Sequence, residues 1–536
     1  MIKSKKNFKI ILLVTVLLIF LTRGLTVSHN IELHCDEQVF FNAAQSLKGY
    51  IFGSSPFYEE VKEYPEGAIV YQLPIHIFTA VLNRIFDAGI TPKLSGRLAS
   101  VFYFTLGAVL GLVLIYRYFS KKPVYSILYG LTVVFSLLHF DQSRYGTGDA
   151  ISYFLLIAIV LLTATALSAE RRNVFYLLSA VFLSGSLCAV KYPLIFFAVI
   201  PLYGLIVLLK GRSGGKKAGL IFAFFVLLYA GFACFSPKAA FDPSYILKTS
   251  SRELDSYFLG SSIVSSLFNL PKICRHFTRV FIYSMLYSGF PLFPIFFIAE
   301  LVHHKKNRTE RSSLDTLLYT LIPILVAIFF TYNLFVPLLF MRAEYPFFFL
   351  SEIYAVVFVG RWLSGKGAKR IVSLALTVFM VLRGGYMVYY MVTDNTQERI
   401  ENLCESSVDE NWSKTTIING FTILPQDIIY YKNIEQTYWD ADRFSTPDSM
   451  ELEPGELFIA SSTDYVFDFL RDIVFPQKYA IEYENNPLIT FCEINSPYYR
   501  GALYPDKYIY CLFGYWIEGT SGFGAEFPPT LVYYRP

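Results

Sequence analysis

Charged residues are scarce in this chain. Asp, Glu, Lys and Arg make up 16% of its 536 residues, whereas about a quarter is usual for a soluble protein. Hydrophobic residues reach 54% and gather in repeated long runs. The hydrocarbon core of a bilayer is therefore the solvent that this composition suits, and a chain of soluble domains alone is excluded.

Several common signatures are also missing. The seven cysteines have no metal-like spacing, which argues against a zinc site and a disulfide framework. Cys492 and Cys511 could pair if their part of the chain is exported, and two buried thiols explain them equally well. The sequence contains no P-loop, dinucleotide fingerprint, HExxH motif or GxSxG nucleophile elbow.

Charge is unevenly distributed along the chain. Residues 393–536 hold 9 Lys and Arg against 23 Asp and Glu, so the first 392 residues carry a net charge of +18. This shift predicts a basic transmembrane domain over 1–392 and an acidic soluble domain over 393–536. Basic residues scattered between apolar runs indicate membrane orientation and give no argument for nucleic acid.

Apolar runs predict an α-helical polytopic membrane protein with about eleven transmembrane helices. The Lys-rich start resembles a signal peptide, but no small-residue cleavage site follows, so we expect an uncleaved first span. The predicted spans are 10–21, 98–116, 123–140, 150–168, 174–190, 194–209, 218–235, 280–302, 315–332, 345–362 and 371–392.

The joints between the spans predict the orientation. With the N-terminus in the cytoplasm, the five inner joints contain seventeen Lys and Arg, while the short outer joints offer little beyond Arg144, Lys191 and Arg342. This asymmetry follows the positive-inside rule. An odd number of spans then places the C-terminal domain outside the cytoplasm.

Three regions outside the predicted spans are too long to be simple connections and are expected to have structure of their own. The outer segment 29–95 includes an amphipathic piece at 71–86 that we expect to lie along the interface. The segment 236–279 forms a second large outer loop. In the acidic tail, 455–462 and 530–534 are strand-like and 463–473 is helix-like, which predicts a small α/β domain.

Adjacent carboxylates stand in the first outer segment. Asp36 and Glu37 follow the first span closely, with His34 nearby. Carboxylates beside a membrane are costly to desolvate unless they have a use or a cationic partner. A solvated loop pair is the plain alternative. Since neighbouring side chains diverge, one carboxylate can face a reacting hydroxyl while the other contacts a different group.

Cations at the outer ends of the spans form a second set of candidates: Arg23, Arg97, Arg144, Lys191 and Arg342. Each could anchor to lipid headgroups, or bind a phosphate at the outer leaflet. Tyr192 follows Lys191 directly. Asp149 stands in a polar joint and could cap the next helix. Arg383 lies inside the last span, where the sequence offers no account of it.

Taken in order, these features resemble the GT-C superfamily of membrane glycosyltransferases, in particular the bacterial branch akin to protein O-mannosyltransferases and the lipid A aminoarabinose transferase. The matching elements cover most of residues 10–363. They are Arg23, Asp36-Glu37, YPEGAIVY (64–71), Arg97, SRYGTGDAISYF (143–154), GSLCAVKYP (185–193) and MRAEYPFFF (341–349). In the last element Ala343 and Glu344 separate Arg342 from Tyr345, which departs from the family's pattern.

The resemblance implies transfer of a sugar from a polyprenyl-phosphate carrier to an extracytoplasmic hydroxyl of a protein, lipid or envelope glycan, with inversion. Asp36 would be the general base and Glu37 would place the acceptor. Lys191, Arg97, Arg144 and Arg342 would bind the donor phosphate. A divalent metal occurs in parts of the superfamily, but no ligand set in this sequence demands one.

Two other classes remain open, a transporter of lipid-linked glycans and a non-catalytic envelope-assembly protein. A transporter is expected to carry ionisable groups near the bilayer midplane. We expect the predicted spans to be nearly free of such groups apart from Arg383. An assembly protein would tolerate the loss of Asp36 and Glu37.

The orientation gives a first testable prediction. A reporter that is active only in the cytoplasm, fused after Pro536, should be silent, because the odd span count and the inner excess of Lys and Arg place this end outside. A fusion at the joint 210–217 is the positive control. Strong activity at Pro536 would overturn the orientation.

Overall fold

A computed structural model describes most of the first 393 residues and five strands beyond them. The described residues are 2–27, 40, 43–44, 46–49, 66–168, 173–242, 244–247, 277, 289–290, 292–307, 312–334, 345–393, 416–420, 435–438, 457–461, 490–494 and 530–534. The chain divides into two compact units, the first holding the helices up to Gly385 and the second holding the strands.

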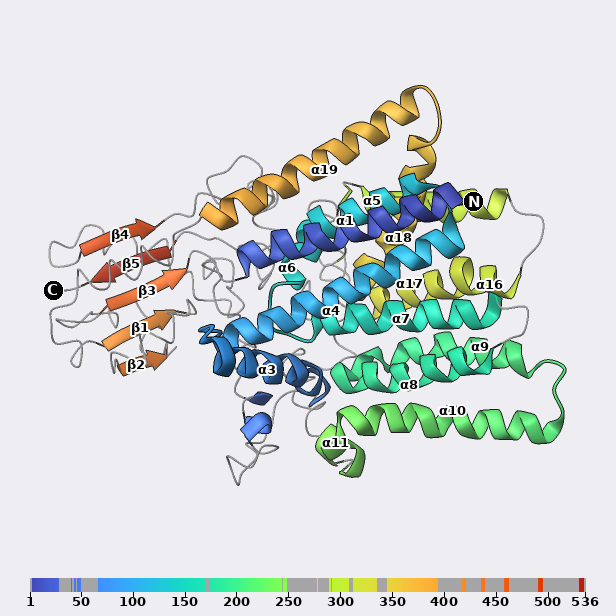
Figure 1. The fold of residues 1–536 in the computed structure, drawn as a ribbon, viewed down its shortest axis with the longest axis horizontal. Coiled ribbons are helices and arrows are strands. Elements are labelled where there is room, and N and C mark those ends of the chain that lie inside the picture. The colour runs from blue at the N-terminus through green and yellow to red at the C-terminus, as the bar shows by residue number, and fades with distance from the viewer. Residues whose placement is uncertain are drawn as a thin grey trace. The chain divides into compact units, whose positions relative to one another are not determined.

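In the residues that the structure describes, the first unit consists of helices and the joints between them (Figure 1). Its elements are α1 (Ile2–Thr26), α3 (Glu66–Phe86), α4 (Pro92–Leu114), η1 (Ile115–Phe119), α5 (Pro123–Phe135), α6 (Leu137–Gln142), α7 (Asp149–Ser168), α8 (Val174–Val190), η2 (Tyr192–Ala198), α9 (Val199–Leu209), α10 (Gly214–Phe235), α11 (Pro237–Phe241), α15 (Phe293–Lys306), α16 (Ser313–Thr316), η3 (Leu317–Leu321), α17 (Ile322–Leu334), α18 (Tyr345–Leu363) and α19 (Ala368–Thr393).

Each of the eleven predicted spans contains helix, which confirms the helical membrane fold. Among the described residues, seven helical segments are long and apolar enough to cross a membrane: Lys6–Thr26, Gly67–Phe86, Pro92–Phe119, Asp149–Ser168, Tyr192–Leu209, Gly214–Phe235 and Ser313–Thr331. One of them, α3, contains the piece 71–86 that we expected at the interface. Its mean hydropathy of 1.3 is the lowest of the seven segments.

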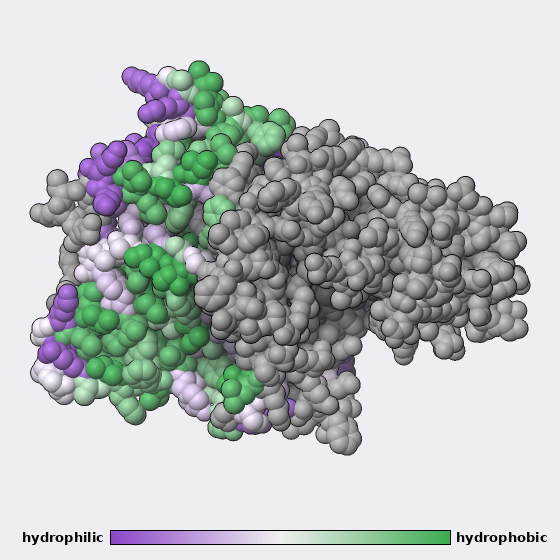
Figure 2. Space-filling view, turned by 180° about the vertical axis from the view of Figure 1, so that it is seen from behind, coloured by the Kyte–Doolittle hydropathy of each residue, from purple (hydrophilic) through white to green (hydrophobic). Residues whose placement is uncertain are grey.

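Hydrophobic side chains cover the sides of the helices. Figure 2 shows them over much of the described part on this face, with hydrophilic residues gathered along one edge. At one end of the unit, α1 and α8 finish while α4 and α7 begin (Figure 1). We call this the Lys191 end, after the residue that follows α8.

Helices α4, α7, α8 and α10 pack in a row in that order, so that α7 lies between α4 and α8. Within the candidate span of α7, 78% of the residues are buried, compared with 11% for α10. Since α10 is as apolar as its neighbours but largely uncovered, its outer face is suited to contact lipid.

Helices α8 and α10 approach closely at two glycines. A Cβ at Gly185 would lie 2.0 Å from the carbonyl oxygen of Leu228, and a Cβ at Gly231 would lie 2.0 Å from that of Phe182. Small residues at such crossings let helix backbones come together, which is a main source of attraction between helices in lipid. The two glycines therefore set the distance between α8 and α10.

The second unit contains a five-stranded sheet in the order β2-β1-β3-β5-β4. Its strands are β1 (Thr416–Gly420), β2 (Glu435–Tyr438), β3 (Leu457–Ser461), β4 (Thr490–Ile494) and β5 (Thr530–Tyr534). β1 pairs in parallel with β2 and β3, with Ile418 opposite Thr437 and Phe458, whereas β5 is antiparallel to β3 and β4. β3 and β5 fall where the sequence predicted strands; the predicted helix 463–473 lies outside the described residues.

The glycine crossing gives a stability prediction. Gly231→Ala should lower the thermal unfolding temperature of the purified protein, because the new methyl group forces α8 and α10 apart at a cost of about 1–3 kcal/mol. Gly219→Ala on the same helix is the control, since nothing lies within 4 Å of its Cβ position. Equal unfolding temperatures for both variants would contradict a tight crossing.

Candidate functional site

Three segments meet at the Lys191 end: the start of α3, the joint 143–148 between α6 and α7, and the end of α8. A Cβ at Gly67 would lie 2.4 Å from the carbonyl carbon of Ala189, so α3 touches the backbone of α8. The Gln72 amide donates a hydrogen bond of 2.7 Å to the Gly146 carbonyl. The polar joint is thus held against α3 by a buried contact.

Asp149 and Lys191 form an ion pair at this junction. Asp149 begins α7, and its side chain is 4% exposed. Its Oδ2 accepts a hydrogen bond of 2.9 Å from the Thr147 hydroxyl, while Oδ1 contacts the Lys191 ammonium. The structure therefore brings together two residues that the sequence singled out separately.

Lys191 keeps part of its side chain accessible. Its backbone is extended after the end of α8, and 32% of the side chain is exposed. An ammonium group has three donors, and the Asp149 carboxylate oxygen engages one of them. Lys191 is therefore held in position while it can still present donors to an anion.

Arg23 is fully buried and acts as a cap for α5. That helix ends at Phe135 because Ser136 is extended, so the last carbonyls of the helix lack helical partners. Arg23 donates to the carbonyls of Val133 and Val134 and, at 3.1 Å, to the Ser143 hydroxyl. These contacts give its guanidinium a structural role.

Arg144 and Arg97 are also buried near the Lys191 end. The Arg144 guanidinium lies 4.7 Å from the centre of the Phe140 ring, and Arg23 lies 4.5 Å from the centre of the same ring. Arg97 on α4 donates to the Val27 carbonyl at 3.5 Å. All three arginines are at most 2% exposed. Anchoring to lipid headgroups requires exposed guanidinium groups, so that alternative does not fit them.

The remaining predicted residues divide into two groups. Tyr192 is described: it is 9% exposed, and its ring centre lies 6.3 Å from that of Phe232 on α10. His34, Asp36, Glu37 and Arg342 lie outside the described residues. Their roles stay predictions.

Sequence reasoning missed two carboxylates inside the predicted spans. Glu300 and Glu352 are both fully buried, so the expectation that the spans are nearly free of ionisable groups apart from Arg383 is wrong. Glu300 pairs with Arg361 at 2.6 Å, and Glu352 pairs with His139 at 2.7 Å. The signal was present in the sequence, since a charge within an apolar run marks a candidate functional position.

Neither carboxylate belongs to a recognisable metal site. In the part of the chain that the structure describes, no three His, Cys, Asp or Glu side chains are grouped so that they could hold a metal ion. The described Lys191 end offers cations, among them Lys191, and such groups suit a phosphate.

No protein-family model and no curated protein matches the chain. Solved structures similar to it include ArnT from Cupriavidus metallidurans bound to undecaprenyl phosphate, with 11% identity, a TM-score of 0.49 and coverage of 85% of this chain and 93% of that one. The apo ArnT structure has 10% identity, a TM-score of 0.47 and coverage of 98% and 97%.

A further similar structure is the archaeal oligosaccharyltransferase AglB from Archaeoglobus fulgidus, in complex with an inhibitory peptide and a dolichol-phosphate. It has 10% identity, a TM-score of 0.49 and coverage of 90% of this chain and 73% of that one. These are GT-C fold glycosyltransferases, the superfamily that the motifs resemble.

The ion pair gives a prediction about stability. Lys191→Met should destabilise the protein by about 1–3 kcal/mol, because it leaves the Asp149 carboxylate buried without its cation. Adding Asp149→Asn should recover part of the loss, since no charge then remains to be desolvated. Unfolding temperatures of both variants test this, with Lys210→Met at an exposed lysine as the control. If Lys191→Met matches the control, the ion pair contributes nothing to stability.

Proposed function

We propose that this protein transfers a sugar from a polyprenyl-phosphate-linked donor to a hydroxyl group of an extracytoplasmic acceptor, with inversion at the anomeric carbon. The observation that carries the proposal is the Lys191 ammonium group, which is partly exposed and held by buried Asp149. Buried Arg144 and Arg97 add positive charge at the same end of the helices. The positive-inside rule assigns that end to the outer leaflet, where a lipid-linked donor would present its phosphate.

The proposed reaction is a direct displacement. The acceptor oxygen forms a bond to the anomeric carbon while the bond from that carbon to the phosphate oxygen breaks. Asp36 takes the proton of the acceptor hydroxyl as a general base, and Glu37 places the acceptor. The leaving polyprenyl phosphate is a weak base that needs no general acid.

Cations stabilise the leaving group in this scheme. Charge builds on the phosphate as the bond to the sugar breaks, and a fixed ammonium or guanidinium in a site with little water lowers the energy of that state. Lys191 suits direct contact because it is accessible. Arg97 and Arg144 act through the local potential, and Arg342 is proposed as a further donor-phosphate residue.

A transporter of lipid-linked glycans is the second candidate. The buried pair of His139 and Glu352 favours it, because ionisable groups inside a membrane bundle often line a substrate or proton path. The two candidates differ in their need for a base. A transporter breaks no sugar–phosphate bond, so it does not require proton removal by Asp36.

The test is the variant Asp36→Asn. We expect transfer to fall by about two to four orders of magnitude, because Asn keeps the size of the side chain but cannot accept the proton. The assay supplies tritiated undecaprenyl-phosphate hexoses and pentoses to purified protein, with membranes of a deletion strain as acceptor. Binding of undecaprenyl phosphate to the variant should be unchanged.

The matched control is Asp87→Asn. Asp87 belongs to the same predicted outer segment, is exposed and has a φ of 49°, a conformation that Asn tolerates well. This control should transfer sugar at the wild-type rate. Near-normal turnover by Asp36→Asn would refute the proposed base and favour the transporter or assembly candidates.

A further inference from the structure

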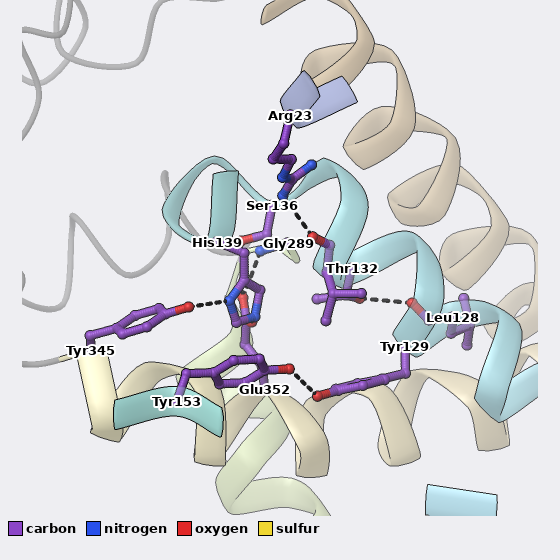
Figure 3. A network of polar contacts seen from close by, with 11 residues as sticks. Arg23, Leu128, Tyr129, Thr132, Ser136, His139, Tyr153, Gly289, Tyr345 and Glu352 are labelled. Carbon is purple, nitrogen blue, oxygen red and sulfur yellow. Dashed lines mark hydrogen bonds and ion pairs between the residues drawn. The ribbon is translucent and has the colours of Figure 1, made fainter. Parts of the chain in front are cut away.

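A buried polar network joins α6 to α18 (Figure 3). His139 on α6 lies between two side chains of α18. Its Nε2 is 2.7 Å from Glu352 Oε2, and its Nδ1 is 2.9 Å from the Tyr345 hydroxyl. All three side chains are at most 1% exposed. Because Tyr345 and Glu352 are seven residues apart, they occupy the same face of α18 and hold the imidazole from both sides.

Glu352 also connects two other segments to α18. Its Oε1 accepts a hydrogen bond of 2.8 Å from the Gly289 backbone N–H and one of 3.5 Å from the Ser136 hydroxyl. Gly289 lies against α5, since a Cβ there would be 2.7 Å from Thr132 Cγ2. One carboxylate therefore links α18, the segment ahead of α15 and the break between α5 and α6.

Aromatic rings enclose the network. The Tyr153 ring on α7 lies 5.6 Å from the His139 ring and 6.2 Å from the Tyr345 ring, measured between centres. Its hydroxyl is hydrogen-bonded to that of Tyr129 at 2.6 Å. The Glu352 carboxylate itself is fully buried, and in such surroundings a polar contact is strong when made and costly when lost.

The network is close in sequence to residues of the candidate site, which favours a functional role over a merely structural one. Arg144 follows His139 closely and lies on the joint 143–148. Asp149, which pairs with Lys191, begins α7 directly after this joint. Arg342 comes three residues before Tyr345. Both segments that leave the network therefore carry residues with a proposed part at the donor phosphate: Arg144 through its charge, Asp149 through Lys191, and Arg342 by direct contact.

The same helix offers an internal comparison. Glu300 on α15 is equally buried and pairs with Arg361, near the far end of α18 from Tyr345. This second carboxylate joins α15 to the last turn of α18, whereas Glu352 contacts α6, which leads to the joint 143–148. We therefore expect removal of the Glu300 charge to perturb packing without loosening that joint.

We propose that Glu352 is a positioning residue, which acts through His139 and Tyr345. It holds the joint 143–148, with Arg144 and the adjoining Asp149, in the geometry that the donor phosphate requires. The proposal rests on the proposed function for its effect on turnover. It rests on contacts within the protein for its effect on the joint.

The experiment compares Glu352→Gln with Glu300→Gln in purified full-length protein. Hydrogen exchange over residues 139–149 should be faster in Glu352→Gln than in wild type and unchanged in Glu300→Gln. With undecaprenyl-phosphate sugars, kcat of Glu352→Gln should fall about tenfold to a hundredfold, as expected for misplaced binding groups, with the acceptor KM unchanged. If Glu352→Gln does not fold, Tyr345→Phe replaces it in the same measurements, because this variant removes only the hydroxyl that contacts His139 and leaves no unpaired charge.

The outcomes separate the two proposals. If both Gln variants change exchange and kcat alike, Glu352 is only a packing residue and the inference is overturned. If the joint exchanges faster in Glu352→Gln alone while wild-type protein transfers no sugar, the proposed function fails and the positioning of the joint is supported. A normal kcat in a variant with a loosened joint also overturns the inference.

Discussion

The break between α5 and α6 is the constraint on which much of the first unit depends. Inside a membrane, backbone carbonyls that leave a helix find no water, so protein groups must satisfy them. The Arg23 guanidinium does so for Val133 and Val134. The Ser136 hydroxyl, at the break itself, donates to Glu352. Without Arg23, the carbonyls of Val133 and Val134 would lose the partners that the break in the helix requires.

Beyond the break lies a polar segment that an unbroken helix could not have offered. His139 meets Glu352, the Phe140 ring lies near the guanidinium groups of Arg23 and Arg144, and Asp149 starts α7 beside Lys191. The contacts that satisfy the break between α5 and α6 therefore lie beside the residues of the candidate site. Part of the polar content of this region is structural, and Arg23 is the clearest case.

The sequence predicted the helical segments well, because a long run of apolar residues is a signal that each segment carries by itself. Each predicted span contains helix, and six of the eleven coincide with described helical segments that are long and apolar enough to cross a membrane. The sequence also held enough information to pair Asp149 with Lys191. The two ends of an antiparallel hairpin lie together, and α7 begins at Asp149 where α8 ends before Lys191. The pairing of His139 with Glu352 could not be predicted in this way. More than two hundred residues separate them, and their contact depends on how α18 packs against α5 and α7.

Exposure then divides the predicted cations by role. Arg23, Arg97 and Arg144 are at most 2% exposed, while 32% of the Lys191 side chain is accessible. A guanidinium group has five donors in a rigid fork, which suits it to satisfy several fixed acceptors within the protein. An ammonium group on a flexible stem can keep one carboxylate contact and turn its other donors to an incoming anion. Of these four cations, Lys191 is therefore the one that can bind a phosphate without rearrangement of the helices. The buried arginines, for their part, raise the local potential that draws the anion to it.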